Sequence, residues 1–216
     1  MVAKTVQRIS VRIDWTKNEA GKYETQIVMG SNDFFSSGTA IRNQIKQFKK
    51  RYLELVKKTQ KIFYGKKFDE KKKYQDLSSL VYYRIGDILQ KFNKKIENEF
   101  EIINYTQAIS RDFGLSQDYI YDLLTVVQVF KKDEIIKSIP FSYYRALKRK
   151  RSELTRLGLF EQEKKRLNRM GNEKKLPGRE KYKVELIYII KKECLLKSSK
   201  EKKIPIKLSP MRSKSS

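Results

Sequence analysis

The sequence predicts a mainly α-helical protein with a small β element, on the strength of three observations. Two segments near the N-terminus alternate apolar and polar residues, two longer segments repeat apolar residues every three or four positions, and residues 109–124 have the spacing of a helix-turn-helix. A period of two is typical of half-buried strands, and a three-to-four spacing is typical of helices packed on one face. We therefore expect an N-terminal β-hairpin followed by long helices.

The hairpin is expected within residues 1–38, which also include a linker. Polar residues 16–21 end in glycine and separate two alternating runs, and residues 30–38 are rich in Ser, Asn, Asp and Gly. Runs of this kind around a glycine-containing loop indicate a β-hairpin. The apolar side of the first strand consists of Ile9, Val11, Ile13 and Trp15.

A helical domain is expected over residues 39–170, and its first helix begins at Thr39. Its apolar residues form a heptad seam of about three repeats: Ile41, Ile45, Phe48, Tyr52, Leu55, Thr59 and Ile62. Parallel copies would set lysines against lysines, so packing within the chain is favoured over self-association. After a charged loop at 64–73, a second helix presents Leu77, Val81, Ile85, Ile88, Phe92 and Ile96.

The helix-turn-helix is predicted at residues 105–130, with Gly114 as the turn. Ser110 lies four residues before the glycine, where a small side chain lets two helices cross closely. Ile120 and Leu123 follow at six and nine residues and form the core face of the second helix. Glycine is suited to such a corner because it adopts left-handed backbone angles without strain. The exposed early positions of the second helix are then Ser116, Gln117, Asp118, Tyr121, Asp122 and Thr125.

The charge balance indicates a polyanionic partner. The net charge is +25, with 36 Lys and 14 Arg against 25 acidic residues, and 24 basic and 8 acidic residues lie between positions 145 and 216. A surplus of this size is an argument for nucleic-acid binding, although not for any fold. One very basic helix is expected at 142–169, with a break into two helices at Gly158 as the alternative. Phosphate contacts are predicted for Arg111, Lys148, Arg149, Lys150, Arg151, Arg156, Lys164, Lys165 and Arg166.

Base contacts are predicted from the second helix of the motif. Gln117 has the chemistry to read adenine, and Asp118 can accept from a cytosine amino group. Tyr121 and Thr125 would contact phosphate or a thymine methyl group, and Ser116 completes the set. Because residues 105–130 hold three Asp against one Arg, this segment is locally acidic, which is unfavourable beside phosphates.

Several classes of chemistry are excluded by the residue types present. With one cysteine and no histidine, the chain can form no intramolecular disulfide, no Cys/His zinc site and no histidine-based catalytic centre. Asp14 faces Glu24 and Gln26 across the hairpin, an arrangement that PD-(D/E)xK nucleases use to hold Mg²⁺, but Gln stands where Lys is usual. We therefore expect no cofactor, no metal and no enzymatic activity.

Neither a membrane-spanning segment nor a signal peptide is predicted. No apolar run reaches the length needed to cross a bilayer, and the first 11 residues lack the apolar block of a secretory signal. The sequence thus predicts a soluble intracellular protein that does not bind membranes, cytoplasmic or associated with the nucleoid.

The order of features over residues 81–166 resembles two related patterns. One is the DNA-binding region of ParB-like partition proteins, where a small–x3–Gly–x5–Ile helix-turn-helix leads into further helices; here ISRDFGLSQDYIYDLLTVVQVF leads to IPFSYYRALKRK. The other is the helical N-terminal domain of a family of PD-(D/E)xK nucleases, in which an aromatic-x-Ile-Gly helix, here YRIG at 83–86, precedes the motif and an apolar-Pro-aromatic segment, here IPF at 139–141, follows it.

This resemblance covers less than half of the chain, and important parts of both families are absent. The chain has no Arg-rich nucleotide-binding box, and residues 181–193 contain no Asp followed by Glu-x-Lys. What the resemblance implies is a DNA-binding helical domain without catalysis.

The C-terminal region is expected to be simpler. Residues 171–179 are expected to form a linker. Residues 182–190 alternate apolar and polar residues, which favours a strand beside the hairpin, with a helix as the alternative. Residues 171–197 therefore form a linker and a short strand or helix, and 198–216 form a disordered basic tail.

Double-stranded DNA is the leading partner hypothesis, with a role in transcription control or in maintaining plasmid or viral DNA. One alternative is RNA binding, with unpaired bases stacked on Phe141, Tyr143, Tyr144 and Phe160. Another is a protein-assembly module that uses the 41–62 seam. A homodimer is a further alternative for the oligomeric state.

Overall fold

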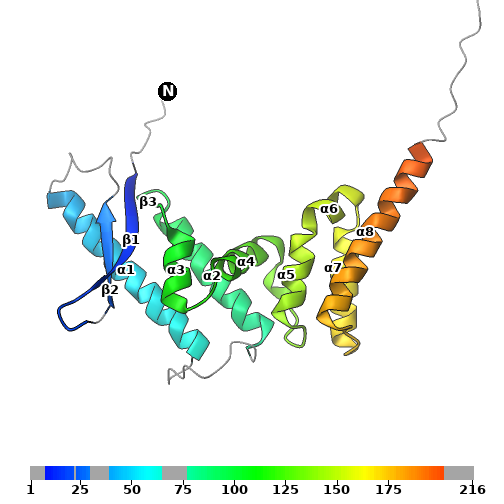
Figure 1. Ribbon diagram of the computed structural model, residues 1–216, viewed down its shortest axis with the longest axis horizontal. Coiled ribbons are helices and arrows are strands. Elements are labelled where there is room, and N and C mark those ends of the chain that lie inside the picture. The colour runs from blue at the N-terminus through cyan, green and yellow to red at the C-terminus, as the bar shows by residue number, and fades with distance from the viewer. Residues whose placement is uncertain (1–7, 22, 30–38, 65–76, 202–216) are drawn as a thin grey trace, which may run out of the picture. The chain divides into compact units, whose positions relative to one another are not determined.

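The structure, a computed structural model, describes residues 8–21, 23–29, 39–64 and 77–201 (Figure 1). In these ranges the protein is mainly helical with a small three-stranded sheet, which confirms the expected fold class. The chain divides into two compact units, Met1–Lys148 and Arg149–Ser216. The expected linker at 30–38 and the charged loop after residue 64 lie outside the described residues.

The predicted hairpin forms the larger part of the sheet. Strand β1 (Ile9–Lys17) runs antiparallel to β2 (Tyr23–Met29), with Ile13 opposite Ile27. Val11 and Ile13 are fully buried on the predicted apolar side, whereas the neighbouring Arg12 is exposed. The alternation therefore marks the inner and outer faces correctly.

The third strand is β3 (Phe100–Ile102), which pairs parallel to β1 on the side away from β2. Just after it, the Asn104 side chain extends the ladder: its Oδ1 accepts from the Ile13 amide at 2.9 Å, and its Nδ2 donates to the Ile13 carbonyl at 2.9 Å. The strand beside the hairpin thus comes from the middle of the chain.

Helix α1 (Thr39–Tyr64) buries the predicted heptad seam inside the first unit. Phe48, Tyr52, Leu55 and Thr59 are all buried. The ring of Phe48 lies 4.9 Å from that of Phe100 and 6.4 Å from that of Phe92 on helix α2 (Ser79–Ile96). Packing of these four seam residues within the chain is confirmed, whereas Ile41, Ile45 and Ile62 of the same seam are half-buried.

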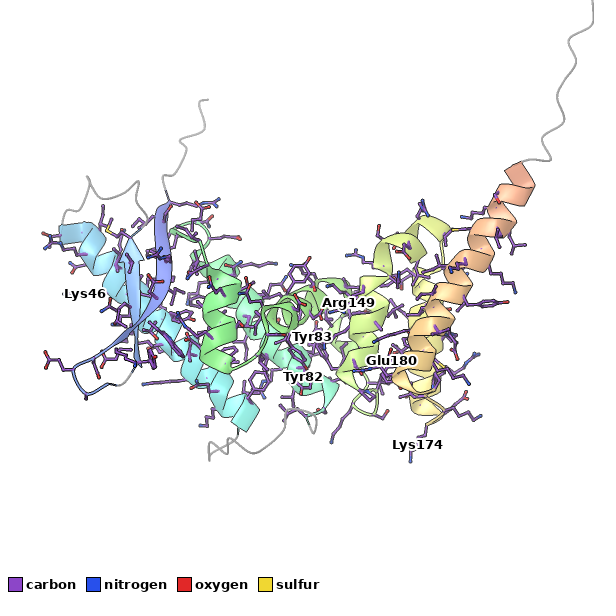
Figure 2. The ribbon with its side chains drawn as sticks, viewed as in Figure 1. Lys46, Tyr82, Tyr83, Arg149, Lys174 and Glu180 are labelled. Atoms are coloured by element: carbon purple, nitrogen blue, oxygen red, sulfur yellow. The ribbon has the colours of Figure 1, made fainter. Side chains whose placement is uncertain are left out.

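The face that α2 buries differs in part from the predicted one. Ile85 and Ile96 are buried as expected, but Tyr82, Gly86 and Leu89 are buried as well. Tyr82 and Tyr83 are marked in Figure 2, and the ring of Tyr82 lies 5.1 Å from that of Phe141. The predicted face included Ile88 and Phe92, which are only half-buried, in place of these three residues.

Helices α3 (Tyr105–Phe113) and α4 (Gln117–Val129) follow, and α2 crosses α4 at Gly86. A Cβ atom placed on Gly86 would lie 2.3 Å from the Leu123 carbonyl oxygen and 2.6 Å from Cγ2 of Val127. Only glycine permits this approach, so Gly86 fixes the position of α4 against the rest of the unit. A short 3-10 helix, η3 (Lys132–Glu134), then leads to α5 (Phe141–Arg149).

The single basic helix expected at 142–169 is wrong, because the structure contains three helices there. They are α5, α6 (Arg151–Leu157) and α7 (Phe160–Asn172), and the boundary between the two units falls before the last residue of α5. Gly158 adopts left-handed angles with φ of 79° and ends α6, while the Leu159 amide donates to the Leu154 carbonyl at 2.8 Å. This is a common helix ending at glycine.

The strand preferred at 182–190 is wrong and the helix given as its alternative is present, since helix α8 (Arg179–Glu201) covers this segment. Tyr182, Leu186 and Ile190 are buried at a spacing of four residues, while Val184 and Tyr188 between them are 64% and 65% exposed. The same residues fit an alternating pattern, which is why the period misled. In the described residues, α8 is the last helix of the second unit.

Two smaller boundary predictions change with it. The linker is shorter than 171–179, because α7 continues to Asn172, and it includes Lys174 with a positive φ of 55°. Residues 198–201 belong to α8 and not to a disordered tail. The rest of the predicted tail, 202–216, lies outside the described residues.

Candidate nucleic-acid interface

The corner between α3 and α4 has the local structure that the sequence predicts. Gly114 takes left-handed angles, with φ of 63° and ψ of 26°. The Leu115 amide donates to the Ser110 carbonyl at 3.0 Å, and the Ser110 hydroxyl donates to the Leu115 carbonyl. The Ser116 hydroxyl then accepts from the Tyr119 amide at 3.2 Å and caps α4. Ser110 is small and also holds the turn.

The exposed face of α4 contains most of the predicted base-contact residues. Ser116, Gln117 and Asp118 are exposed, and Tyr121 is 58% exposed. Thr125 is half-buried, and its hydroxyl donates to the Tyr121 carbonyl at 2.8 Å. The opposite face, with Ile120 and Leu123, is fully buried. The N-terminal half of α4 is therefore open on one side.

Asp122 was expected on the exposed face, and this expectation is wrong. It is buried and accepts from Arg145 Nε at 2.5 Å and from Lys148 Nζ at 3.3 Å. Both cations come from α5, whose side chains cover this edge of α4. The sequence gives no sign of this cluster, because Asp122 lies more than 20 residues before both cations.

A second carboxylate of the motif also lies inside. Asp112 accepts from the Tyr52 hydroxyl at 2.5 Å and lies 3.5 Å from Arg111 Nε. Burial, together with the negative charge of Asp112, raises the pKa of Tyr52, so the phenol remains a donor. Of the three carboxylates in residues 105–130, only Asp118 is exposed. One of the three carboxylates, Asp118, therefore lies on the surface of α4.

Two cations border this surface through aromatic rings. Lys148 Nζ lies 4.5 Å from the ring centre of Tyr121, and the Arg145 guanidinium lies 4.6 Å from that of Tyr119. Such contacts hold a cation against a ring face. The side chain of Lys148 is only 13% exposed, so it supports α4 and does not offer the open phosphate contact predicted from the sequence.

Arg111 likewise has a packing role. Its guanidinium lies 4.4 Å from the ring centre of Trp15 and donates to the Ile13 carbonyl at 3.4 Å. These contacts join α3 to β1 and remove Arg111 from the set of open cations.

The second unit contains the remaining predicted phosphate contacts, and the structure separates them into two groups. Lys150 pairs with Glu153, Lys164 with Glu161, and Arg166 with both Glu163 and Glu185. The side chain of Lys164 is buried, with only 10% of its surface exposed. The exposed group consists of Arg149, which is marked in Figure 2, Arg151, Arg156 and Lys165.

The aromatic residues suggested for RNA binding are part of the core. Phe141, Tyr143, Tyr144 and Phe160 are all buried. The Tyr144 hydroxyl accepts from the Ile136 amide at 2.7 Å, and burial raises its pKa to about 12. None of these rings can stack on a base without unfolding its surroundings.

The polar residues of the hairpin have local partners. Asp14 pairs with Arg12 at 2.9 Å, and Glu24 accepts from the Asn18 side chain at 2.8 Å. Across the described ranges, no three His, Cys, Asp or Glu side chains gather where they could hold a metal ion. Among the helices described, none combines the length and apolar character required to cross a membrane.

Comparison with known proteins gives no relative for this chain. No family model, curated protein or solved structure matches it.

Proposed function

We propose that this protein binds double-stranded DNA through α3 and α4, with the N-terminal half of α4 reading bases in the major groove. The main support is that Gln117 and Tyr121 are exposed on a face from which two of the three nearby carboxylates are withdrawn. The second helix of a helix-turn-helix uses such N-terminal positions for base contacts. A role in transcription control or DNA maintenance is part of this proposal.

Phosphate binding is assigned to three exposed cations of the second unit: Arg151, Arg156 and Lys165. Each cation that neutralises a phosphate releases counterions, so affinity falls with salt by a slope of about 0.9 per contact on a logarithmic scale. Lys148, Lys164 and Arg166 are left out because their side chains already pair with carboxylates.

Duplex DNA is favoured over single-stranded RNA by the position of the aromatic residues. Recognition of unpaired RNA depends on rings that stack on bases. The four rings that the sequence offered for this are buried, while α4 offers Gln117, whose amide can pair with adenine.

Substitution of Arg151, Arg156 and Lys165 by Gln should make the salt dependence of duplex binding shallower. The slope of log K against log[salt] should change by about 2.7 for three lost contacts. Fluorescence anisotropy of a labelled duplex, titrated at several KCl concentrations, measures this. The matched control replaces Lys181, Lys191 and Lys192, which are exposed on α8, by Gln and so removes the same charge. Its slope should change by less than about 1.

Two results would count against this assignment. Equal slope changes for the two triple variants would mean that the charge acts diffusely. Displacement of the duplex by an RNA hairpin with the same number of phosphates, at equal concentration, would mean that the protein does not prefer DNA.

A further inference from the structure

A groove of about 310 Å³ lies between α1 and α2 in the first unit, away from any role assigned above. The two helices are antiparallel, since Arg51 of α1 pairs with Glu99, just beyond the end of α2, and the ring of Phe63 at the end of α1 lies 6.2 Å from that of Tyr82 near the start of α2. Its volume is at the lower end of the range of ligand-binding pockets.

The floor of the groove is apolar. Leu55 and Ile96 are buried at its base, while Ile88 and Phe92 are half-buried and keep part of their surface open. Open apolar surface between two helices can accept the side chains of a third.

The rim is cationic on both sides. Arg51 and Lys58 are seven residues apart on α1, and Lys91 and Lys95 are four apart on α2, so each pair lies on one side of its helix. Lys91 pairs with Asp87 at 2.7 Å but is 74% exposed, and Arg51 pairs with Glu99 at 3.3 Å. Glu54 is the one carboxylate among the lining residues.

We propose that this groove docks an acidic amphipathic helix of a partner protein. Apolar residues of the partner at i, i+3 or i+4 and i+7 would lie on the floor, and flanking Glu or Asp would face the two cationic rims. Charge complementarity favours an acidic partner and would also speed association. This inference does not depend on DNA binding by α4.

A nucleic acid is a poorer fit to the groove. Its one aromatic residue, Phe92, lies 6.4 Å from Tyr105 in a stacked arrangement and 6.4 Å from both Phe48 and Tyr52. The ring is therefore engaged in the core, and the remaining floor is aliphatic, whereas strand binding uses open ring faces.

The test uses a labelled synthetic helix with Leu at a and d positions and Glu at the flanking positions, titrated with the full chain. Lys58→Glu with Lys95→Glu should weaken its binding about tenfold or more, or about 1.4 kcal/mol. The matched control, Lys57→Glu with Lys94→Glu, changes the same charge on the adjacent residues of the same helices, which do not line the groove, and should weaken binding less than about threefold. These residues lie on exposed helix surfaces, and circular dichroism checks that both variants fold.

Three outcomes would overturn the proposal. The first is no binding of the acidic helix by the wild-type chain, and the second is an equal loss in the two double variants. The third is unchanged binding when the Leu residues of the peptide are replaced by Gln. A fourth result would assign the groove to nucleic acid instead. In that case a single-stranded oligonucleotide would displace the peptide from the wild-type chain, and Lys58→Glu with Lys95→Glu would abolish binding of the oligonucleotide.

Discussion

Asp122→Ala is expected to lower the free energy of unfolding of the first unit by about 3 kcal/mol. The substitution leaves Arg145 and Lys148 close together with no counter-ion in a largely buried place. Removal of one partner from a buried ion pair typically costs about 3–5 kcal/mol, and the lower end applies because the Arg145 side chain is 24% exposed and partly solvated. Urea unfolding followed by the fluorescence of Trp15, the one tryptophan, reports on this unit.

Asp118→Ala is the matched control, because Asp118 is an exposed carboxylate on the same helix. Its loss should cost less than about 1 kcal/mol, the usual limit for a charge in the first turn of a helix. Asp122→Asn keeps the shape and one acceptor oxygen, so its stability should lie between that of the wild type and Asp122→Ala. If Asp122→Ala were no less stable than Asp118→Ala, the α4–α5 cluster would not support the interface.

Gly86→Ala is expected to destabilise the protein by about 2–3 kcal/mol, because the added methyl group overlaps the backbone of α4. The Cβ atom would lie 2.3 Å from the Leu123 carbonyl oxygen, and a main-chain atom cannot move aside as a flexible side chain can. We expect α4 to shift and duplex binding to weaken together with stability. Thermal unfolding followed by circular dichroism measures the first effect.

Gly178→Ala provides the comparison. A Cβ atom there meets no atom within 4 Å, so the change in stability should stay within about 0.5 kcal/mol. A Gly86→Ala variant as stable as Gly178→Ala would mean that α2 and α4 do not cross as closely as described.

Those parts of the fold that depend on local pattern were predicted from the sequence. The alternation around Ile13 placed the hairpin and its buried face, and the seam around Tyr52 placed α1. The corner at Gly114 was predictable because a left-handed residue, a small residue and two core positions have fixed spacings.

Long-range contacts decided the parts that the sequence did not predict. The three residues of β3 are too few to show a period, and their parallel pairing with β1 joins segments about 90 residues apart. In α8, the positions of Tyr182, Leu186 and Ile190 fit the period of a strand as well as that of a helix. Only packing within the second unit distinguishes a helix from a strand here.

The candidate site shows the same division. Exposure of Gln117 and Tyr121 follows from helical spacing, so the exposed face of α4 was predictable. Which cations remain open was not, because a lysine such as Lys148 in a basic run pairs with Asp122, a carboxylate on another helix. Charge runs predict a polyanionic partner but do not identify its contacts.

Base reading by α4 is the central claim, and selection of bound sequences from random duplexes tests it most directly. Wild type, Gln117→Ala and Gln128→Ala are compared; Gln128 is exposed at the other end of the same helix and serves as the control. The wild type and Gln128→Ala should enrich one common sequence motif, while Gln117→Ala should lose preference at one base position and retain its affinity for unselected duplex. Failure of the wild type to enrich any motif would contradict the account.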